Sequence, residues 1–287
     1  MLRNLPFHKA LISLSFALLF YSASCVAQDV SKYEALPQKG KFYVYWGWNR
    51  DFYAKSDIHF TGNNYDFTLL DVVGKDTQTP FSFDDYLNPF KATIPQTNFR
   101  LGYYFNEHYD ISFGIDHMKY VMQQNQEVYV IGFINESGTK YDGVYDHKLL
   151  KLTPDFLRYE HTNGLTYVNV ELRRTDKLVE LGKLVHFNLD LNLIEGVSGG
   201  FLYPRTDATL LGNLRNNEFH VAGYGTALML GLNIKFLKYF FIQTELKAGF
   251  INLPDVLTTN SNADRASQHF NFLQSNLLIG GSFSVFK

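Results

Sequence analysis

A histidine with a neighbouring hydroxyl residue and nearby carboxylates marks the stretch of this sequence best suited to chemistry. Glu160, His161 and Thr162 are consecutive, and Glu171 follows further along the chain. An imidazole, a hydroxyl and a carboxylate are the groups that nucleophilic acyl transfer combines. The same stretch continues into Asn163-Gly164, and Asn-Gly is the strongest short signal for a hairpin turn. The sequence therefore leaves two interpretations open, a catalytic site and a turn between two strands.

A second group of side chains has the chemistry of metal ligands. Asp110, Asp116 and His117 lie close together in the sequence, and carboxylates and imidazoles bind metal ions. Successive side chains of a strand point to opposite faces, so His117 is expected to face away from both aspartates. We therefore predict polar residues of a barrel interior or rim here, with no metal site and no cofactor.

The elements that position these residues alternate between polar and apolar side chains from Lys41 onward. In the stretch 165–173 one face carries Val168, Val170 and Leu172, and the other carries Glu171 and Arg173. Such a polar face does not suit a dry soluble core, because an unpaired buried charge costs several kcal/mol. It suits the inner face of a membrane β-barrel, whose outer face is apolar. We expect a network of charges in the lumen, formed by Arg100, Arg158, Glu160, Glu171, Arg173, Asp190, Glu245 and Lys247.

The composition supports strands and argues against several classes of protein. The chain has 287 residues, of which 46% are hydrophobic and 16% aromatic, and aromatic residues favour strands. With 26 basic and 28 acidic residues the formal charge is -2, so no basic field would attract a nucleic acid. Beyond residue 27 no apolar run reaches the roughly 18 residues of a transmembrane helix, which excludes a helical membrane bundle.

The N-terminus has the pattern of a signal peptide for Sec-dependent export. Arg3 and Lys9 precede an apolar stretch at 10–21, and small residues end before Gln28. Cys25 is the only cysteine and is expected to leave with the leader, although a lipoprotein anchor is an alternative. The sequence thus predicts three parts: a signal peptide over 1–27, a short periplasmic segment over 28–40 and an outer-membrane β-barrel over 41–287.

The predicted fold is an all-β, transmembrane, antiparallel up-and-down β-barrel of about ten strands. If the stretches 127–134 and 143–150 are also counted as strands, the barrel has twelve strands. Long loops alternate with tight turns, as in outer-membrane barrels, although ten strands do not place every long loop outside. We expect 81–90 to fold over the barrel mouth, Trp46 and Trp48 to lie at the membrane interface, and Asp264 to be exposed in a loop. The ten strand candidates are 42–50, 57–70, 97–106, 109–123, 154–161, 165–173, 184–196, 224–236, 240–250 and 270–286.

Two resemblances add to this. The C-terminal residues 280–287 (GGSFSVFK) resemble the signal by which the barrel assembly machinery recognises Gram-negative outer-membrane proteins, except that Lys287 follows the final Phe286. With the leader and the strand sequence YDISFGIDHMKYVM at 109–122, the chain resembles uncharacterised outer-membrane β-barrel proteins of Bacteroidetes type. This resemblance implies a location in the membrane rather than a chemistry.

The stretch around His161 is loosely similar to the lipid A deacylase barrels. That similarity implies His161 as the base, Thr162 as the nucleophile and Glu171 as the carboxylate that orients the imidazole. The family has a serine two positions after the histidine, where this chain has Asn163. Strand alternation also places His161 on the face opposite Glu171.

Three functions remain open from the sequence alone. The first is an integral, non-enzymatic outer-membrane barrel with a structural, adhesive or narrow-pore role. The alternatives are an outer-leaflet lipid A acyl hydrolase and a soluble periplasmic β-protein. The expected partners are outer-membrane lipid and lipopolysaccharide, and the barrel assembly machinery during biogenesis.

Overall fold

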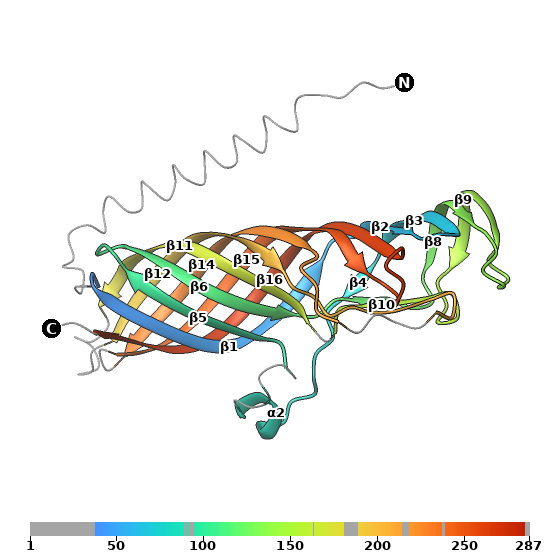
Figure 1. The fold of residues 1–287 in the computed structure, drawn as a ribbon. Helices are drawn as coiled ribbons and strands as arrows, with labels where there is room; N and C mark the ends of the chain where they lie inside the picture. Colours follow the sequence, from blue (N-terminus) through green and yellow to red (C-terminus); the bar gives the residue numbers. More distant parts are fainter. Residues whose placement is uncertain are drawn as a thin grey trace.

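Eight antiparallel strands form a closed ring in the computed structural model, which describes residues 38–88, 91, 95–162, 164–180, 189–213, 218–236 and 239–284. The ring strands are β1 (Lys41–Tyr53), β5 (Thr97–Tyr104), β6 (Tyr109–Met118), β11 (Leu165–Glu180), β12 (Leu189–Leu202), β14 (Gly223–Phe236), β15 (Phe240–Leu257) and β16 (Arg265–Ser284). They follow one another around the ring in chain order, and β16 pairs back to β1. Figure 1 shows the ring as a long cylinder whose strands are tilted relative to its axis. The predicted antiparallel up-and-down barrel is confirmed.

Side chains alternate between the lumen and the exterior along every ring strand. Glu171 is fully buried, whereas its neighbours Val170 and Leu172 are each 48% exposed. The exterior is therefore apolar and the interior polar, the reverse of a soluble β-barrel. Outward-facing residues from the eight strands form a continuous apolar belt, which includes Phe52, Phe99, Leu101, Ile111, Phe113, Ile115, Val170, Leu172, Val197, Phe201, Leu228, Leu230, Leu232, Ile242, Leu246, Leu273, Leu277 and Ile279.

The number of strands in the ring differs from the predicted ten because two candidates lie outside it. Residues 57–70 form two short strands, β2 (Ser56–Thr61) and β3 (Tyr65–Val72), which pair as a hairpin. Residues 154–161 contain β10 (Leu157–Glu160), which pairs in a separate sheet.

The stretches 127–134 and 143–150 do form strands, β8 (Glu127–Ile134) and β9 (Gly143–Lys151). The main sheet thus has twelve strands, the larger predicted number, but β2, β3, β8 and β9 extend it beyond the ring.

This extension arises because β16 changes its partner along its length. Residues 272–284 pair with β1, and residues 265–268 pair with β2 instead. The sheet therefore leaves the ring at one end and continues through β3 and β8 to β9, which forms its free edge. A second sheet has the order β13-β10-β7-β4, where β13 is Asp207–Leu210, β7 is Val121–Met122 and β4 is Gly74–Lys75.

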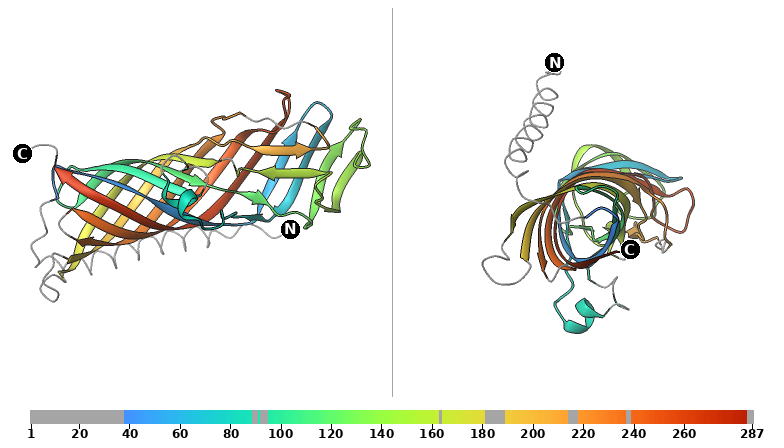
Figure 2. Two further views of the ribbon diagram at one scale, coloured as in Figure 1. Left: turned by 90° about the horizontal axis from the view of Figure 1, so that it is seen from below. Right: turned by 90° about the vertical axis from the view of Figure 1, so that its left-hand side faces the viewer.

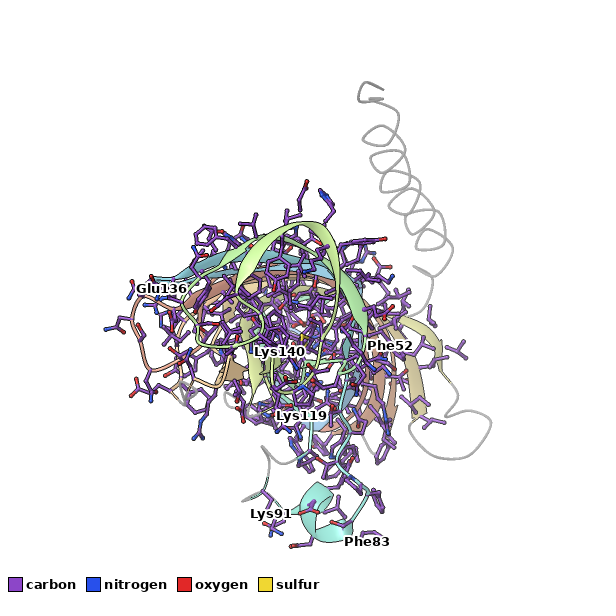
Figure 3. All side chains as sticks on the ribbon, turned by 90° about the vertical axis from the view of Figure 1, so that its right-hand side faces the viewer. Phe52, Phe83, Lys91, Lys119, Glu136 and Lys140 are labelled. Carbon is purple, nitrogen blue, oxygen red and sulfur yellow. The ribbon has the colours of Figure 1, made fainter. Side chains whose placement is uncertain are left out.

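We call these eight non-ring strands the cap. The cap packs around a hydrophobic core that includes Phe60, Phe67, Met118, Tyr120, Val130, Phe156 and Tyr159. It lies at the end of the barrel opposite the beginning of β1 and the end of β16, as Figure 1 shows. Figure 3 looks onto the cap and shows side chains crowded across the end of the barrel.

An eight-stranded ring places its three longest connections at the cap end. These connections follow β1, β6 and β12, whereas the β5–β6 connection at the other end contains only residues 105–108. The helix α2 (Phe83–Leu87) belongs to the first long connection. It lies beside the ring rather than over its mouth (Figure 2), so the expectation that 81–90 covers the mouth is wrong for the described residues 81–88.

Some sequence-based predictions fall outside the described residues. They are the signal peptide over 1–27 with Cys25, the segment 28–37, strand residues 184–188 and the end of the C-terminal signal at 285–287. In the part of the chain that the structure describes, no helix is long and apolar enough to span a membrane.

Candidate functional site

A network of fully buried charges crosses the lumen of the ring. Glu171 on β11 lies at its centre, with one carboxylate oxygen 2.9 Å from Arg100 Nη2 and 2.8 Å from Lys247 Nζ. Because β11 and β15 are separated in the ring by β12 and β14, the contact between Glu171 and Lys247 spans the interior. Arg173 Nη2 lies 3.3 Å from Glu245 Oε1 and extends the network. The structure thus brings together five of the eight predicted luminal charges.

Asp116 is a sixth member of the network. The sequence predicted it as a polar residue of the barrel interior or rim, but not as a member of the charged network. Its carboxylate lies 3.0 Å from Lys247 Nζ and accepts a hydrogen bond from Asn169 Nδ2 at 3.1 Å. Three cations therefore face three carboxylates: Arg100, Arg173 and Lys247 against Asp116, Glu171 and Glu245. The even spacing from Asp110 to Asp116 already placed both aspartates on one face of β6.

Tyr45 connects two halves of the network. Its hydroxyl accepts hydrogen bonds from Arg100 Nε at 2.8 Å and Arg173 Nη1 at 3.2 Å, and lies 3.2 Å from Glu245 Oε1, to which it donates. Sequence reasoning missed this residue because it considered only charged side chains. The period of two along β1 could have found it, since Tyr43, Tyr45 and Asn49 all face inward.

A glycine provides space for the most deeply buried arginine. Arg100 is 0% exposed, and a Cβ atom at Gly114 on the neighbouring strand would lie 2.5 Å from the guanidinium carbon. The guanidinium therefore occupies the space that a side chain at Gly114 would need.

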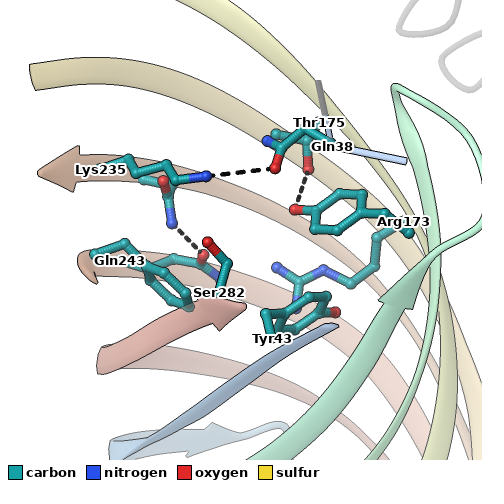
Figure 4. Close-up of a pocket in the computed structure, with 10 residues that line it drawn as sticks. Gln38, Tyr43, Arg173, Thr175, Lys235, Gln243 and Ser282 are labelled. Carbon is teal, nitrogen blue, oxygen red and sulfur yellow. Dashed lines mark hydrogen bonds between the residues drawn. The ribbon is translucent and has the colours of Figure 1, made fainter. Parts of the chain in front are cut away.

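Polar layers continue along the lumen on both sides of the charged network. Towards the cap, Asn98 Nδ2 donates to Asp116 at 2.7 Å, and Gln274 Nε2 donates to Asp51 at 3.0 Å. Towards the other end, Tyr43 donates to Asp110 at 2.6 Å. A small pocket at that end, lined by Arg173, Lys235 and other residues (Figure 4), has about 20 Å³ open to water, which is space for about one molecule.

Three of the eight predicted luminal charges do not belong to this network. Arg158 is exposed and Glu160 is only half buried, because both belong to β10 in the cap rather than to a ring strand. Asp190 is in the lumen, but it pairs with Lys177 at 2.9 Å near the end of the barrel away from the cap. The predicted luminal position is wrong for Arg158 and Glu160, since β10 is not a strand of the ring.

The structure does not assemble a triad from His161, Thr162 and Glu171. The His161 ring is fully buried in the cap, where Nδ1 lies 2.9 Å from Thr206 Oγ1. Thr162 donates to Glu160 at 3.1 Å, and Glu171 is bound in the charged network. Burial lowers the pKa of His161 to about 3, so this imidazole is a weak base with no surface open to a substrate.

The second candidate group is also dispersed. Asp110 and Asp116 are buried in the lumen, whereas His117 Nδ1 lies 3.2 Å from Thr166 Oγ1. Among the described residues no group of three or more His, Cys, Asp or Glu side chains could hold a metal ion.

Comparison with known proteins gives likeness of overall shape only. No protein-family model and no curated protein matches the sequence. Solved structures that are similar include the outer membrane protein OprG from Pseudomonas aeruginosa, with 9% identity and a TM-score of 0.38 over 86% of this chain and 98% of that one. The outer membrane protein AlkL has 8% identity and a TM-score of 0.40 over 89% and 95% of the two chains. Both are outer-membrane proteins, and scores this low support no argument about function.

Proposed function

We propose that this protein is an integral outer-membrane β-barrel that does not conduct solutes and that displays a folded β-cap at the cell surface, in a structural or adhesive role. The observation that carries the proposal is the inverted distribution of polarity. The exterior of the ring is an apolar belt, whereas the lumen contains a closed network of paired charges. In water such a belt would favour aggregation, and in a bilayer it faces hydrocarbon.

The location has a direct test. The protein should fractionate with the outer membrane and should migrate faster on a gel when it is not heated, because a folded barrel binds less detergent. Recovery in the soluble periplasmic fraction without detergent would contradict the proposal and favour a soluble β-protein.

The absence of conduction follows from the filled lumen. An ion crossing the ring would have to displace Arg100, Glu171 and Lys247, which are buried and paired with one another. Purified protein in a planar lipid bilayer should therefore give no steady single-channel current. A reproducible conductance would favour the narrow-pore role instead.

The orientation can be tested with cysteines, because the only cysteine of the chain is Cys25, in the predicted leader. Val144 is 79% exposed in the cap, and Asn106 is exposed in the short turn at the opposite end. Val144→Cys should react with a membrane-impermeant maleimide on intact cells. Asn106→Cys should react only after the outer membrane is opened, and the unmodified protein serves as the control. The opposite result would place the cap in the periplasm.

The adhesive role is favoured by the outer face of β8 and β9. Tyr129 and Leu149 are paired across these strands, as are Phe133 and Val144, and all four side chains are exposed. The other edge of β9 ends the sheet, and exposed apolar patches mark interaction sites. Replacing Tyr129 and Leu149 by serine should weaken attachment of cells to surfaces without changing the amount of folded barrel. Attachment equal to that of an Asp146→Ser control would favour a purely structural role.

Membership of a Bacteroidetes-type group of barrels rests on the resemblance of the leader, the strand at 109–122 and the C-terminal residues. Export by a Sec signal peptide rests on the same N-terminal pattern. N-terminal sequencing of the mature protein should give Gln28 as the first residue.

A further inference from the structure

We propose that the segment 81–88, which contains α2, inserts into the outer leaflet of the membrane and contacts lipid acyl chains. The inference rests on the proposed function, since it requires the ring to lie in a bilayer. The segment leaves the cap and lies beside the outer wall of the ring, as both views in Figure 2 show. It is the part of the described chain that projects sideways from the barrel.

The outer surface of this segment is aromatic and unusually exposed. Phe81 is 70% exposed and Phe83 is 73% exposed, and Leu87 is exposed as well. Figure 3 shows Phe83 pointing away from the barrel. In water these side chains would lose the stabilisation that burial of apolar surface gives. An exposed apolar cluster of this kind marks a contact with a membrane or a partner.

The segment is held against the barrel wall by its own aromatic rings. Tyr86 lies 6.1 Å from Trp48 of β1, measured between ring centroids, and its hydroxyl donates to the Thr79 carbonyl at 2.7 Å. Phe81 lies 5.2 Å from Tyr86 and 5.3 Å from Phe83. The exposed rings therefore continue the aromatic surface that begins on the ring itself.

The register of β1 and β16 gives the depth of this contact. Trp48 is paired with Leu277, which belongs to the apolar belt. Along β16 the belt continues from Leu277 to Ile279 and Phe283 on one side and to Leu273 on the cap side. Trp48 therefore lies close to the middle of the belt, on its cap side, and the segment reaches it from the cap end of β1. With the cap outside, the segment adjoins the half of the belt that faces the outer leaflet.

Continuity with the belt identifies acyl chains as the occupant. A protein partner at this position would have to replace lipid along the neighbouring wall of the ring, whereas lipid can cover both surfaces at once. The polar side of the segment is compatible with this placement, because Lys91 forms ion pairs with both Asp84 and Asp85. Apolar residues on one side and paired charges on the other are typical of segments that lie in the membrane interface.

A single-tryptophan experiment tests the inference. Trp46 and Trp48 are the only tryptophans, so replacing both with phenylalanine gives a background without tryptophan that keeps aromatic rings on β1. Phe83→Trp is introduced into this background, and the protein is reconstituted into phosphatidylcholine vesicles with brominated acyl chains. Bromine quenches tryptophan fluorescence only at close range. The emission of Phe83→Trp should be quenched, and iodide in the water should quench it weakly.

Two matched variants make every outcome informative. Leu230→Trp on the belt should be quenched by the brominated lipid, and Val144→Trp on the cap should be quenched only by iodide. If Leu230→Trp is quenched but Phe83→Trp behaves like Val144→Trp, the segment lies in water and the inference is overturned, while the proposed function stands. If Leu230→Trp is not quenched in folded protein, the ring is not in the bilayer and both proposals fail. Heat-dependent gel mobility checks that each variant is folded.

Discussion

Replacing Glu171 by glutamine should destabilise the barrel without preventing it from folding. The change removes one charge and keeps the shape of the side chain. At an effective dielectric constant of about 20, contacts of 2.8 and 2.9 Å each correspond to roughly 6 kcal/mol of Coulomb attraction. Much of this is offset in the native protein by the desolvation of all three groups.

The net loss is expected at the lower end of the range for a broken buried ion pair, which is roughly 3 to 5 kcal/mol. Asp116 remains 3.0 Å from Lys247 Nζ and still compensates that charge. We therefore expect the free energy of unfolding to fall by about 3 kcal/mol, measured by denaturant titration in detergent with Trp46 and Trp48 as fluorescent reporters.

The matched control is Asp146→Asn in β9, because the Asp146 side chain is 99% exposed. Asp264, expected from the sequence to be exposed, does not suit this purpose, since it is buried and accepts a hydrogen bond from Thr259 at 2.6 Å. The control should change the free energy of unfolding by less than about 0.5 kcal/mol.

A second variant tests whether the loss of stability comes from the ion pair between Glu171 and Lys247. Combining Glu171→Gln with Lys247→Met restores charge balance in the lumen. The double variant should therefore lose less free energy of unfolding than the two single variants lose together, by about 1 to 3 kcal/mol. Strict additivity, or a Glu171→Gln loss no larger than that of the control, would refute the reasoning. A normal unfolding curve with an altered number of lipid A acyl chains would favour the deacylase interpretation.

Three further predictions concern the belt, the cap and the close approach of two strands. Leu230→Arg places a charge in the apolar belt and should reduce assembly into membranes, at a cost of about 2 to 4 kcal/mol, whereas Leu230→Phe should assemble normally; equal yields on heat-modifiable gels would show that the faces are reversed. Burial lowers the pKa of His161 to about 3 from about 6.5, so as the pH falls the unfolded chain binds a proton before the folded protein does. At pH 5 this should lower the free energy of unfolding by about 2 kcal/mol relative to pH 8. This decrease should be absent in His161→Gln, which denaturant titrations of both proteins at pH 8 and pH 5 would measure. An equal decrease in the free energy of unfolding of the two proteins would contradict the prediction. Gly200→Ala would place a Cβ atom 2.0 Å from the Val168 carbonyl oxygen and should cost about 1 to 3 kcal/mol, whereas Gly199→Ala meets open space and should be neutral; similar thermal midpoints for the two variants would exclude this close contact.

The sequence by itself determined the class of fold and the direction of most side chains. Side chains of a strand alternate strictly, so one polar face among apolar neighbours decides which residues point inward. Glu171 and Arg173 were assigned to the lumen in this way, and both are buried there. The same period assigned Val170 to the exterior, where it is half exposed.

Only the tertiary structure decided how many strands close the ring. Closure depends on β16 exchanging β1 for β2 along its length, and pairing between distant strands leaves no local pattern in the sequence. The stretches 57–70 and 154–161 alternate like barrel strands, yet they belong to the cap, because their inward side chains pack into an apolar core. Long-range packing, rather than local period, separates the two cases.

The partners inside the lumen were also beyond the sequence. Alternation shows that a side chain points inward, but it does not show which side chain it meets across the barrel. The contact of Glu171 with Lys247 depends on the diameter and stagger of the ring. The position of Asp264 was mispredicted for a related reason, since burial in a loop depends on the elements that pack against it. Local alternation therefore determined the direction of each side chain, whereas the closed ring determined which groups pair inside the lumen.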